Sequence, residues 1–393
     1  MTQTIGIGVI GMGWMGLVHS RAYRSIEDRF PQSGLKPQLV ICADDVEARA
    51  EQGRSQIGFT QATTHWQRVI ENPDVQIVNI TTPNVFHLPM VSAAVAAGKH
   101  VFCEKPVGCS PQETARIAAT ARTAGVCSGV GYNYRWAPLV QYARQLISSG
   151  KLGEITHYRG RFLVGYGSHP DSVLSWRFQR EIAGTGALGD LMSHVVDMAH
   201  MLAGPIESIV SQQHTYIPTR PQATPGKGTH FSVDASGPRG KVTNEDYVSA
   251  LARFESGAQG IFEVCRIVNG PRCEMAFEVN ATKGALKWNF ERMNEIEIVL
   301  SDDASEPHPG SAVVIAGPEH PGYQHFYPGP GNSMSYEDLK TLEMFHFLQR
   351  ITNDAPGAPG LEEALKVAEV LAAMTGSWES GNWQEVQPIP VAL

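Results

Sequence analysis

Three residues near the middle of the chain have the types and the spacing of a proton-transfer site. Asp190, His194 and Asp197 are four and three residues apart, so a helix would place all three side chains on one face. A histidine flanked by carboxylates is held in one tautomer and can accept a proton near neutral pH. The same pattern also fits a helix-start carboxylate beside a structural histidine, so it is informative only together with other residues.

A glycine-rich segment near the N-terminus predicts a phosphate-binding turn. Gly11, Gly13 and Gly16 follow a β-like run and open a helical pattern. Gly11 allows the tight turn, Gly13 lets the backbone approach a pyrophosphate, and Gly16 allows close contact between helix and strand. The N–H groups at the start of the helix then favour phosphate. We therefore expect a dinucleotide to contact Gly11, Gly13, Trp14, Met15 and Gly16.

Asp44 follows the second predicted strand and favours NAD over NADP as that dinucleotide. A carboxylate at this point accepts hydrogen bonds from the adenosine ribose and repels a 2′-phosphate. Asp44 lies 28 residues after Gly16, further than the usual spacing of about 20, and an insertion at residues 30–37 accounts for the difference. The alternative is that Asp44 only caps the next helix.

The first third of the chain alternates strand and helix patterns, which indicates an α/β Rossmann domain with a doubly wound parallel sheet over residues 1–132. Strands are predicted at residues 5–10, 39–43, 75–81, 100–103 and 126–132. Ser110, Pro111 and Glu113 are expected to start a helix with an N-cap and a proline in its first turn.

From residue 133 to 393 the pattern predicts an α+β domain with a large, mostly antiparallel open sheet. Longer strand patterns follow one another across short turns, which favours hairpins. A final amphipathic helix is predicted at residues 361–374, and it could pack back toward the first domain.

Composition excludes several classes of function. The chain has 393 residues, of which 31 are basic and 39 acidic, for a net charge of −8. An acidic protein is not expected to bind nucleic acid, and no apolar run is long enough for a membrane span. The six cysteines form no C-x-x-C pair, and the N-terminus lacks a secretory pattern. We therefore expect a reduced, cytoplasmic protein.

Three further segments make the chain resemble a known enzyme family. Residues 82–87 follow one predicted strand, residues 104–106 follow the next, and residues 189–197 carry the aspartates and histidine named above. Together with the N-terminal glycines they resemble the Gfo/Idh/MocA family, which includes glucose–fructose oxidoreductase and inositol dehydrogenase. Residues 174–179 and 183–190 are most similar to the levoglucosan dehydrogenase branch of bacterial sugar dehydrogenases.

The resemblance implies hydride transfer between a nicotinamide and a secondary alcohol of a sugar or cyclitol. It also implies that the open sheet mediates assembly, so we expect a homodimer or homotetramer. Pro106 would be a cis-proline that turns Lys105 into the active site, and Glu104 would meet the nicotinamide ribose. The residues implied to contact the cofactor outside the glycine turn are Thr82, Asn84, His87, Glu104, Lys105, Trp176 and Arg177.

Alcohol oxidation needs a group that takes the hydroxyl proton while the carbon loses hydride. We expect His194 to be this acid/base group, with Asp190 orienting the substrate and Asp197 steadying His194 or its helix. Lys105 comes from the carboxyl edge of the parallel sheet, where ligands of such folds bind. Its ammonium group would stabilise alkoxide charge or serve as an alternate base.

Further substrate contacts are predicted from residues around the next strand. Tyr132, Asn133 and Arg135 follow the last Rossmann strand, and Arg161 lies on the strand after it. They could line a sugar pocket, or be ordinary strand and loop residues, and Arg161 fits an ion pair equally well. No metal site is expected, because the histidines lack ligand spacing.

The leading hypothesis is an NAD-dependent dehydrogenase that acts on a pyranose, anhydrosugar or cyclitol at a ring carbon such as C3. The alternative is an NAD-dependent glycosidase, in which C3 oxidation, elimination of the aglycone, water addition and re-reduction recycle the NADH. A third reading is a non-catalytic NAD(H)-binding regulator, which the combination of Lys105, Asp190 and His194 argues against. NADH accumulation separates the first two.

Overall fold

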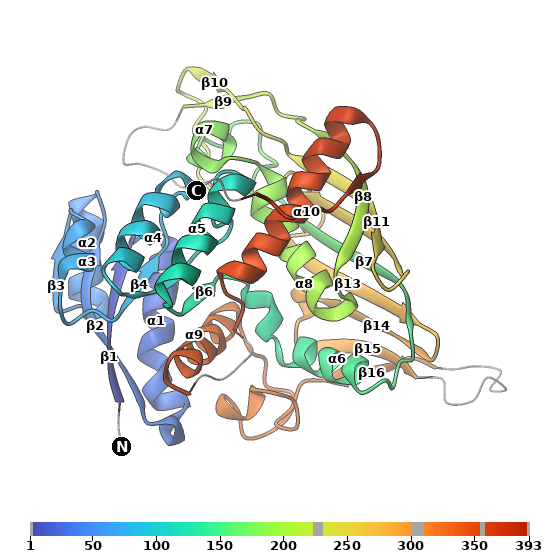
Figure 1. Ribbon diagram of the computed structural model, residues 1–393, viewed down its shortest axis with the longest axis horizontal. Coiled ribbons are helices and arrows are strands. Elements are labelled where there is room, and N and C mark those ends of the chain that lie inside the picture. The colour runs from blue at the N-terminus through green and yellow to red at the C-terminus, as the bar shows by residue number, and fades with distance from the viewer. Residues whose placement is uncertain (1–2, 223–230, 301–309, 354–357, 391–393) are drawn as a thin grey trace. The chain divides into compact units, whose positions relative to one another are not determined.

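The computed structural model describes residues 3–222, 231–300, 310–353 and 358–390. The chain divides into two compact units (Figure 1). The first comprises Met1–Trp136, Ser335–Leu365 and Pro390–Leu393, and the second comprises Ala137–Met334 and Lys366–Ile389. A segment late in the sequence thus belongs to the N-terminal unit, and a domain boundary after residue 132 stays a prediction.

A six-stranded parallel sheet forms the centre of the first unit, in the order β3-β2-β1-β4-β5-β6. Its strands are β1 (Gln3–Ile10), β2 (Leu35–Ala43), β3 (Gln61–Thr63), β4 (Ile77–Ile80), β5 (His100–Cys103) and β6 (Ser128–Val130). β1 is buried from Ile5 to Ile10, as expected for a parallel strand covered on both faces. The strand order reverses between β1 and β4, where doubly wound sheets bind ligands. The predicted doubly wound sheet is confirmed.

Helices and short turns connect the strands of this unit. They are α1 (Trp14–Arg29), α2 (Glu47–Gln52), α3 (Gln67–Glu71), α4 (His87–Ala96) and α5 (Pro111–Ala124), with short turns η1 (Pro31–Ser33), η2 (Gly53–Ile57), η3 (Asn84–Phe86) and η4 (Asn133–Trp136). Ser110 Oγ accepts a hydrogen bond from the Glu113 amide at 3.2 Å, and Pro111 is in the first turn. The predicted cap of α5 is therefore confirmed.

Helix α9 (Tyr336–Asn353) packs against α1 in the first unit (Figure 1). Phe345 stacks on Phe30 with ring centroids 3.7 Å apart, and Phe347 meets the edge of Phe102 at 5.3 Å. The sequence patterns did not predict this helix. Its burial against α1 makes it part of the layer that covers the parallel sheet.

The second unit is built on a nine-stranded sheet in the order β16-β15-β14-β13-β7-β12-β11-β8-β17. These strands are β7 (Ile155–Val164), β8 (Ile206–His214), β11 (Tyr247–Phe254), β12 (Gln259–Cys265), β13 (Cys273–Ala281), β14 (Gly284–Asn289), β15 (Glu295–Leu300), β16 (Ala312–Ile315) and β17 (Gln384–Glu385). All pairs are antiparallel except β7 with β12. The predicted large, mostly antiparallel sheet is confirmed.

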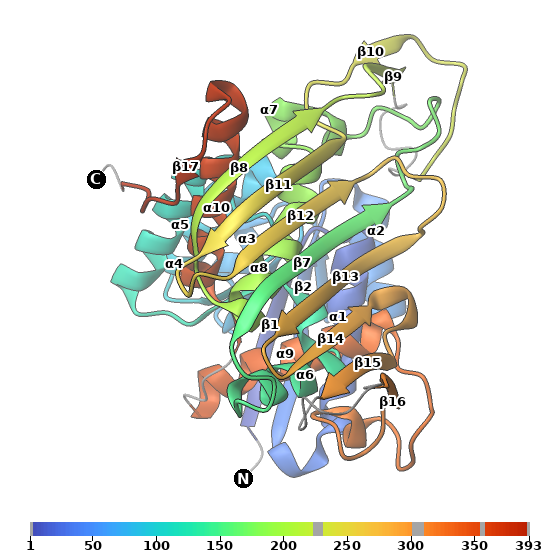
Figure 2. The same ribbon diagram turned by 90° about the vertical axis from the view of Figure 1, so that its right-hand side faces the viewer.

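Among the described residues, helices lie on one face of this sheet, and Figure 2 shows none on the other. The helices are α6 (Pro138–Ser148), α7 (Arg180–Ala183) and α8 (Ser193–Ala203), with turns η5 (Trp176–Phe178), η6 (Leu188–Met192), η7 (Phe290–Arg292) and η8 (Tyr323–His325) and a separate pair of strands, β9 (Thr219–Pro221) and β10 (Arg239–Lys241). α8 packs on β7. Figure 2 looks onto the opposite face of the sheet, where Leu251 and Ile261 are exposed.

Helix α10 (Leu361–Ser380) is longer than the predicted helix at residues 361–374. Its C-terminal half is bound to the edge of the second sheet, because Ser211 on β8 donates through Oγ to the Met374 carbonyl at 2.7 Å. The Ser211 amide also donates to Ser377 Oγ at 2.9 Å. These bonds, together with the pairing of β17 with β8, anchor the C-terminal segment in the second unit.

Candidate active site

The glycine turn between β1 and α1 has the shape that a pyrophosphate needs. Gly11 has φ of +94°, which favours glycine. A Cβ added at Gly16 would lie 2.0 Å from the Gly11 carbonyl oxygen, so only glycine fits there. Gly13 precedes α1, no side chain caps that helix, and a Cβ at Gly13 would meet no atom within 4 Å. Open space beside the α1 N-terminus fits a dinucleotide phosphate.

Two aromatic residues flank this turn. Trp14, the first residue of α1, is 53% exposed and stacks on Tyr336 of α9 with ring centroids 5.5 Å apart. The Tyr336 hydroxyl lies 3.7 Å from Met15 Sδ. α9 therefore supplies a side chain to the border of the glycine turn, which no motif in the sequence indicated.

Asp44 lies at the end of β2 and is bound to the glycine turn. Its Oδ2 accepts from the Met12 amide at 2.8 Å, and its Oδ1 accepts from the Val46 amide at 2.9 Å. Burial raises the pKa of Asp44, while the two backbone hydrogen bonds oppose this effect. Val46 is the N-cap residue of α2, and no side-chain cap hydrogen bond is made there, so the bond from the Val46 amide does not support the capping alternative. Contact with the adenosine ribose stays a prediction.

His87 connects two loops at the carboxyl edge of the sheet. Its ring is fully buried, with Nε2 at 3.0 Å from the Thr82 carbonyl and Nδ1 at 3.1 Å from the carbonyls of Pro106 and Val107. Burial lowers the pKa of His87, and the surrounding carbonyl oxygens oppose this effect. His87 thus holds the loops after β4 and β5 together.

Residues near His87 differ in how much they face solvent. Asn84 is buried, Thr82 is half-buried, and Val85 and Phe86 between them and α4 are exposed. Val85 and Phe86 thus expose apolar side chains at the carboxyl edge of the parallel sheet, the edge at which ligands of such folds bind.

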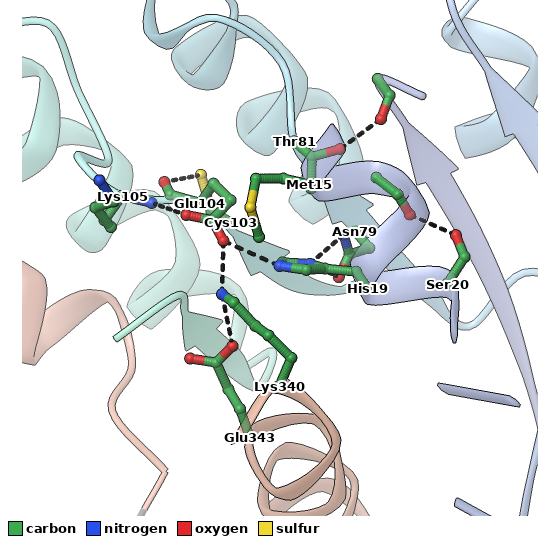
Figure 3. A network of polar contacts seen from close by, with 12 residues as sticks. Met15, His19, Ser20, Asn79, Thr81, Cys103, Glu104, Lys105, Lys340 and Glu343 are labelled. Carbon is green, nitrogen blue, oxygen red and sulfur yellow. Dashed lines mark hydrogen bonds and ion pairs between the residues drawn. The ribbon is translucent and has the colours of Figure 1, made fainter. Parts of the chain in front are cut away.

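Glu104 is the centre of a buried polar network at the end of β5 (Figure 3). Its Oε1 accepts from His19 Nε2 at 2.9 Å and from Lys340 Nζ at 2.8 Å. Its Oε2 accepts from the Lys105 amide at 3.1 Å. Burial disfavours the charged form, but the Lys340 charge and the His19 hydrogen bond hold the pKa of Glu104 well below its usual range. A contact of Glu104 with the nicotinamide ribose stays a prediction.

Lys105 and Pro106 form the turn that follows this carboxylate. The Lys105–Pro106 peptide bond is cis, as the resemblance implied, and the Lys105 side chain is half-buried. After β6, Tyr132 and Asn133 are buried and Arg135 is half-buried. Among the described residues, Asn133 Nδ2 has no hydrogen-bond partner, so it is a buried donor suited to a ligand acceptor.

The proposed acid/base residues of the second unit lie on η6 and α8. η6 is a π-helical turn that contains Asp190, and π turns are frequent at functional sites. Asp190 Oδ2 accepts from the Tyr166 hydroxyl at 2.9 Å. Burial and the Asp190 charge both raise the pKa of Tyr166, so its hydroxyl stays protonated and donates. His194 is 5% exposed, and its ring centroid is 5.9 Å from that of Phe162.

Asp197 lies deeper in the same helix and is also buried. It is close enough to Tyr158 for its charge to add to the burial that raises the pKa of Tyr158. That Asp197 steadies His194 or its helix stays a prediction.

Two buried arginines hold the Trp176–Phe178 turn, and the sequence reading missed both. Arg266 donates to the Arg177 carbonyl at 3.0 Å and to Asp246 Oδ1 at 2.9 Å. The guanidinium groups of Arg266 and Arg220 lie 4.4 and 4.1 Å from the Phe178 ring centroid. The Arg177 side chain stacks on Trp176 at 4.3 Å. No motif signals these arginines, since charged side chains are usually exposed.

Arg161 lies apart from His194. Phe162 faces α8, so its neighbour Arg161 points to the opposite face of the sheet. There its Nη2 is 2.8 Å from Glu274 Oε1. The structure therefore does not bring Arg161 together with His194, and it gives Arg161 the ion-pair role that was the alternative.

The described residues leave other kinds of site without support. Among them, no helix is long and apolar enough to cross a membrane, and no three histidine, cysteine or acidic side chains group together as metal ligands. All six cysteines lie within the described ranges, and no disulfide joins any of them.

A doubly wound sheet with a glycine turn of this kind is the architecture of dinucleotide-binding domains, and in this chain a second unit with a large, mostly antiparallel sheet accompanies it. Residues 5–132 match the model of an oxidoreductase family with an NAD-binding Rossmann fold, and residues 140–287 match the GFO/IDH/MocA C-terminal domain. The chain belongs to the Gfo/Idh/MocA family of oxidoreductases, and its cofactor is NAD.

Individual relatives match over nearly the whole chain. Levoglucosan dehydrogenase of Pseudarthrobacter phenanthrenivorans is 34% identical over 389 residues, which cover 98% of this chain and 99% of the relative. A structure of levoglucosan dehydrogenase with NADH and L-sorbose superposes with a TM-score of 0.92 at 32% identity, covering 99% of this chain and all of that one. An NAD-binding oxidoreductase from Klebsiella pneumoniae gives 0.90 at 34% identity, covering 98% and 100%.

Proposed function

We propose that the protein oxidises a secondary hydroxyl of a pyranose, anhydrosugar or cyclitol with NAD, at a ring carbon such as C3. The observation that carries this proposal is the pairing of Asp190 with Tyr166 four residues before the buried His194. A carboxylate that receives a phenolic hydroxyl on one side can accept a substrate hydroxyl with its remaining lone pairs. The 34% sequence identity to levoglucosan dehydrogenase supports a sugar as the substrate.

Each chemical step has a candidate residue. The turn at Gly11, Gly13 and Gly16 would hold NAD, which when bound would supply the hydride acceptor. His194 takes the hydroxyl proton, and Asp190 orients the hydroxyl. Lys105 stabilises the negative charge that develops on the oxygen, or serves as an alternate base. Asn133 adds a buried donor for a ligand acceptor, and Trp176 and Arg177 would flank the nicotinamide.

Assembly and location are part of the proposal. We expect a homodimer or homotetramer formed through the uncovered sheet face, where Leu251 and Ile261 are exposed. No disulfide joins any of the six cysteines, which fits a reducing compartment such as the cytoplasm.

The test is NADH formation from purified protein and NAD across sugars, anhydrosugars, cyclitols and aryl glycosides, with aglycone release measured in parallel. NADH that rises in step with substrate consumption supports the dehydrogenase. Aglycone release that needs only catalytic amounts of NAD and leaves no NADH would instead identify the NAD-dependent glycosidase.

A further inference from the structure

Lys340 is a buried lysine outside every motif of the sequence. It lies on α9 and is 1% exposed. Its Nζ is 2.8 Å from Glu104 Oε1 and 2.9 Å from Glu343 Oε2 (Figure 3). Lysine is almost never fully buried unless it is paired, and taking an ammonium group out of water is costly. A cost of this kind points to a role at Glu104.

The Glu104 carboxylate connects this lysine to Lys105. Oε1 receives Lys340 and His19, and Oε2 receives the Lys105 backbone amide at 3.1 Å. A Cβ added at Gly131 would lie 2.6 Å from Oε1, so glycine there lets the carboxylate pack against the backbone after β6. The two oxygens belong to one rigid carboxylate group, so a displacement of Oε1 also moves Oε2 and the Lys105 amide that donates to it.

The hydrogen bonds around His19 determine which groups are charged. His19 Nε2 donates to Glu104, so Nδ1 is an acceptor and receives the Asn79 amide at 3.0 Å. Tyr23 donates to Asn79 Oδ1 at 3.3 Å. Burial and the Lys340 charge lower the pKa of His19, in agreement with a neutral ring. Lys340 is then the buried cation that pairs with both Glu104 and Glu343.

Removal of Lys340 would leave two buried carboxylates close together. The network could respond by protonating one of them, by protonating His19, or by drawing the nearby Lys105 ammonium toward Glu104, with which Lys105 already interacts electrostatically. Each response changes the position or the charge environment of Lys105.

We propose that Lys340 is a positioning residue for Lys105: it holds the ionised Glu104 carboxylate in place, and the other oxygen of that carboxylate fixes the Lys105 backbone at the end of β5. The proposal rests on the proposed function in one respect, namely that Lys105 acts on the substrate.

Lys340→Met tests this, because methionine retains the apolar stem and removes the ammonium group. We expect kcat to fall about tenfold to a hundredfold, since small displacements of a catalytic group have effects of this size, while the dissociation constant of NAD changes much less. Amide hydrogen exchange at Lys105 should become faster, and an unchanged exchange rate would overturn the proposal. The control is Glu337→Gln, which breaks an exposed ion pair between α9 and Arg21 of α1. It should change neither kcat nor the amide exchange rate at Lys105.

A double-mutant cycle separates positioning from general stability. In a Lys105→Ala background, Lys340→Met should cost much less activity than in the native protein, because the two losses share one cause. Equal losses in both backgrounds would mean that Lys340 does not act through Lys105.

Two further variants cover the remaining outcomes. If Lys340→Met fails to fold, Lys340→Met/Glu343→Gln keeps the net charge of the network unchanged and should show the same kinetic loss. Native turnover in Lys105→Ala would contradict the proposed function, and hydrogen exchange at Lys105 would still decide whether Lys340 holds this backbone.

Discussion

Tyr166→Phe removes the hydroxyl that donates to Asp190 Oδ2 at 2.9 Å and leaves the ring in place. A hydrogen bond to a charged group contributes about 1.5–3 kcal/mol, and about 1.4 kcal/mol corresponds to a tenfold change in rate. We therefore expect kcat/KM for the sugar to fall about tenfold to a hundredfold, because Asp190 loses the partner that orients it. Steady-state NADH formation measures this effect.

The matched control is Tyr158→Phe in the same unit. Tyr158 is fully buried, and among the described residues its hydroxyl has no hydrogen-bond partner. Removal of an unsatisfied hydroxyl is neutral or stabilising, so activity and melting temperature should be retained or rise. Native kcat/KM in Tyr166→Phe, or equal losses in both variants, would refute the role given to the bond between Tyr166 and Asp190.

Three other predictions concern the cofactor, the buried charges and pH. Asp44→Ser should weaken NAD binding about tenfold or more and raise the relative use of NADP, whereas Asp45→Ser should do neither. An unchanged ratio of the NADP and NAD dissociation constants in titrations would exclude the ribose contact. Arg266→Met leaves Asp246 as an uncompensated buried charge and should lower the free energy of unfolding, measured in urea titrations, by about 3–5 kcal/mol. The control Arg159→Met removes an exposed partner of Glu278 and should lower it by less than about 1 kcal/mol. The folded-state pKa values of Glu104 and His19 are both lowered, so both groups contribute full stability above their unfolded pKa values of about 4.3 and 6.5 and lose it as pH falls toward the folded values. The free energy of unfolding, measured at stepwise lower pH, should therefore decline, and a flat profile would exclude this linkage.

Local patterns were sufficient to predict the parallel sheet and the cofactor turn. The glycine positions, the buried run of β1 and the cap at Ser110 all depend on neighbours in sequence. The prediction of a cis bond before Pro106, which the structure shows, rested on the family resemblance and not on the local sequence pattern.

Long-range pairings could not be read from the sequence. α9 carries Lys340 and Glu343, which look like solvent-facing charges in a helix, yet both are buried. Their burial could not be predicted, because Glu104, the partner of Lys340, lies 236 residues away in the sequence. Arg266 was missed for the same reason, since its partners are contributed by several loops. Arg161 was placed near the substrate because strand alternation alone does not say which face carries α8.

Transfer of deuterium from a sugar to the cofactor tests the central claim most directly. Levoglucosan deuterated at C3 would be incubated with the protein and an equimolar amount of NAD, and the recovered cofactor and sugar would be analysed by mass spectrometry. We expect deuterium in the NADH in proportion to the oxidised sugar, with little transfer in His194→Ala despite normal NAD binding. Sugar product that forms while the cofactor carries no deuterium would contradict hydride transfer from C3 to NAD.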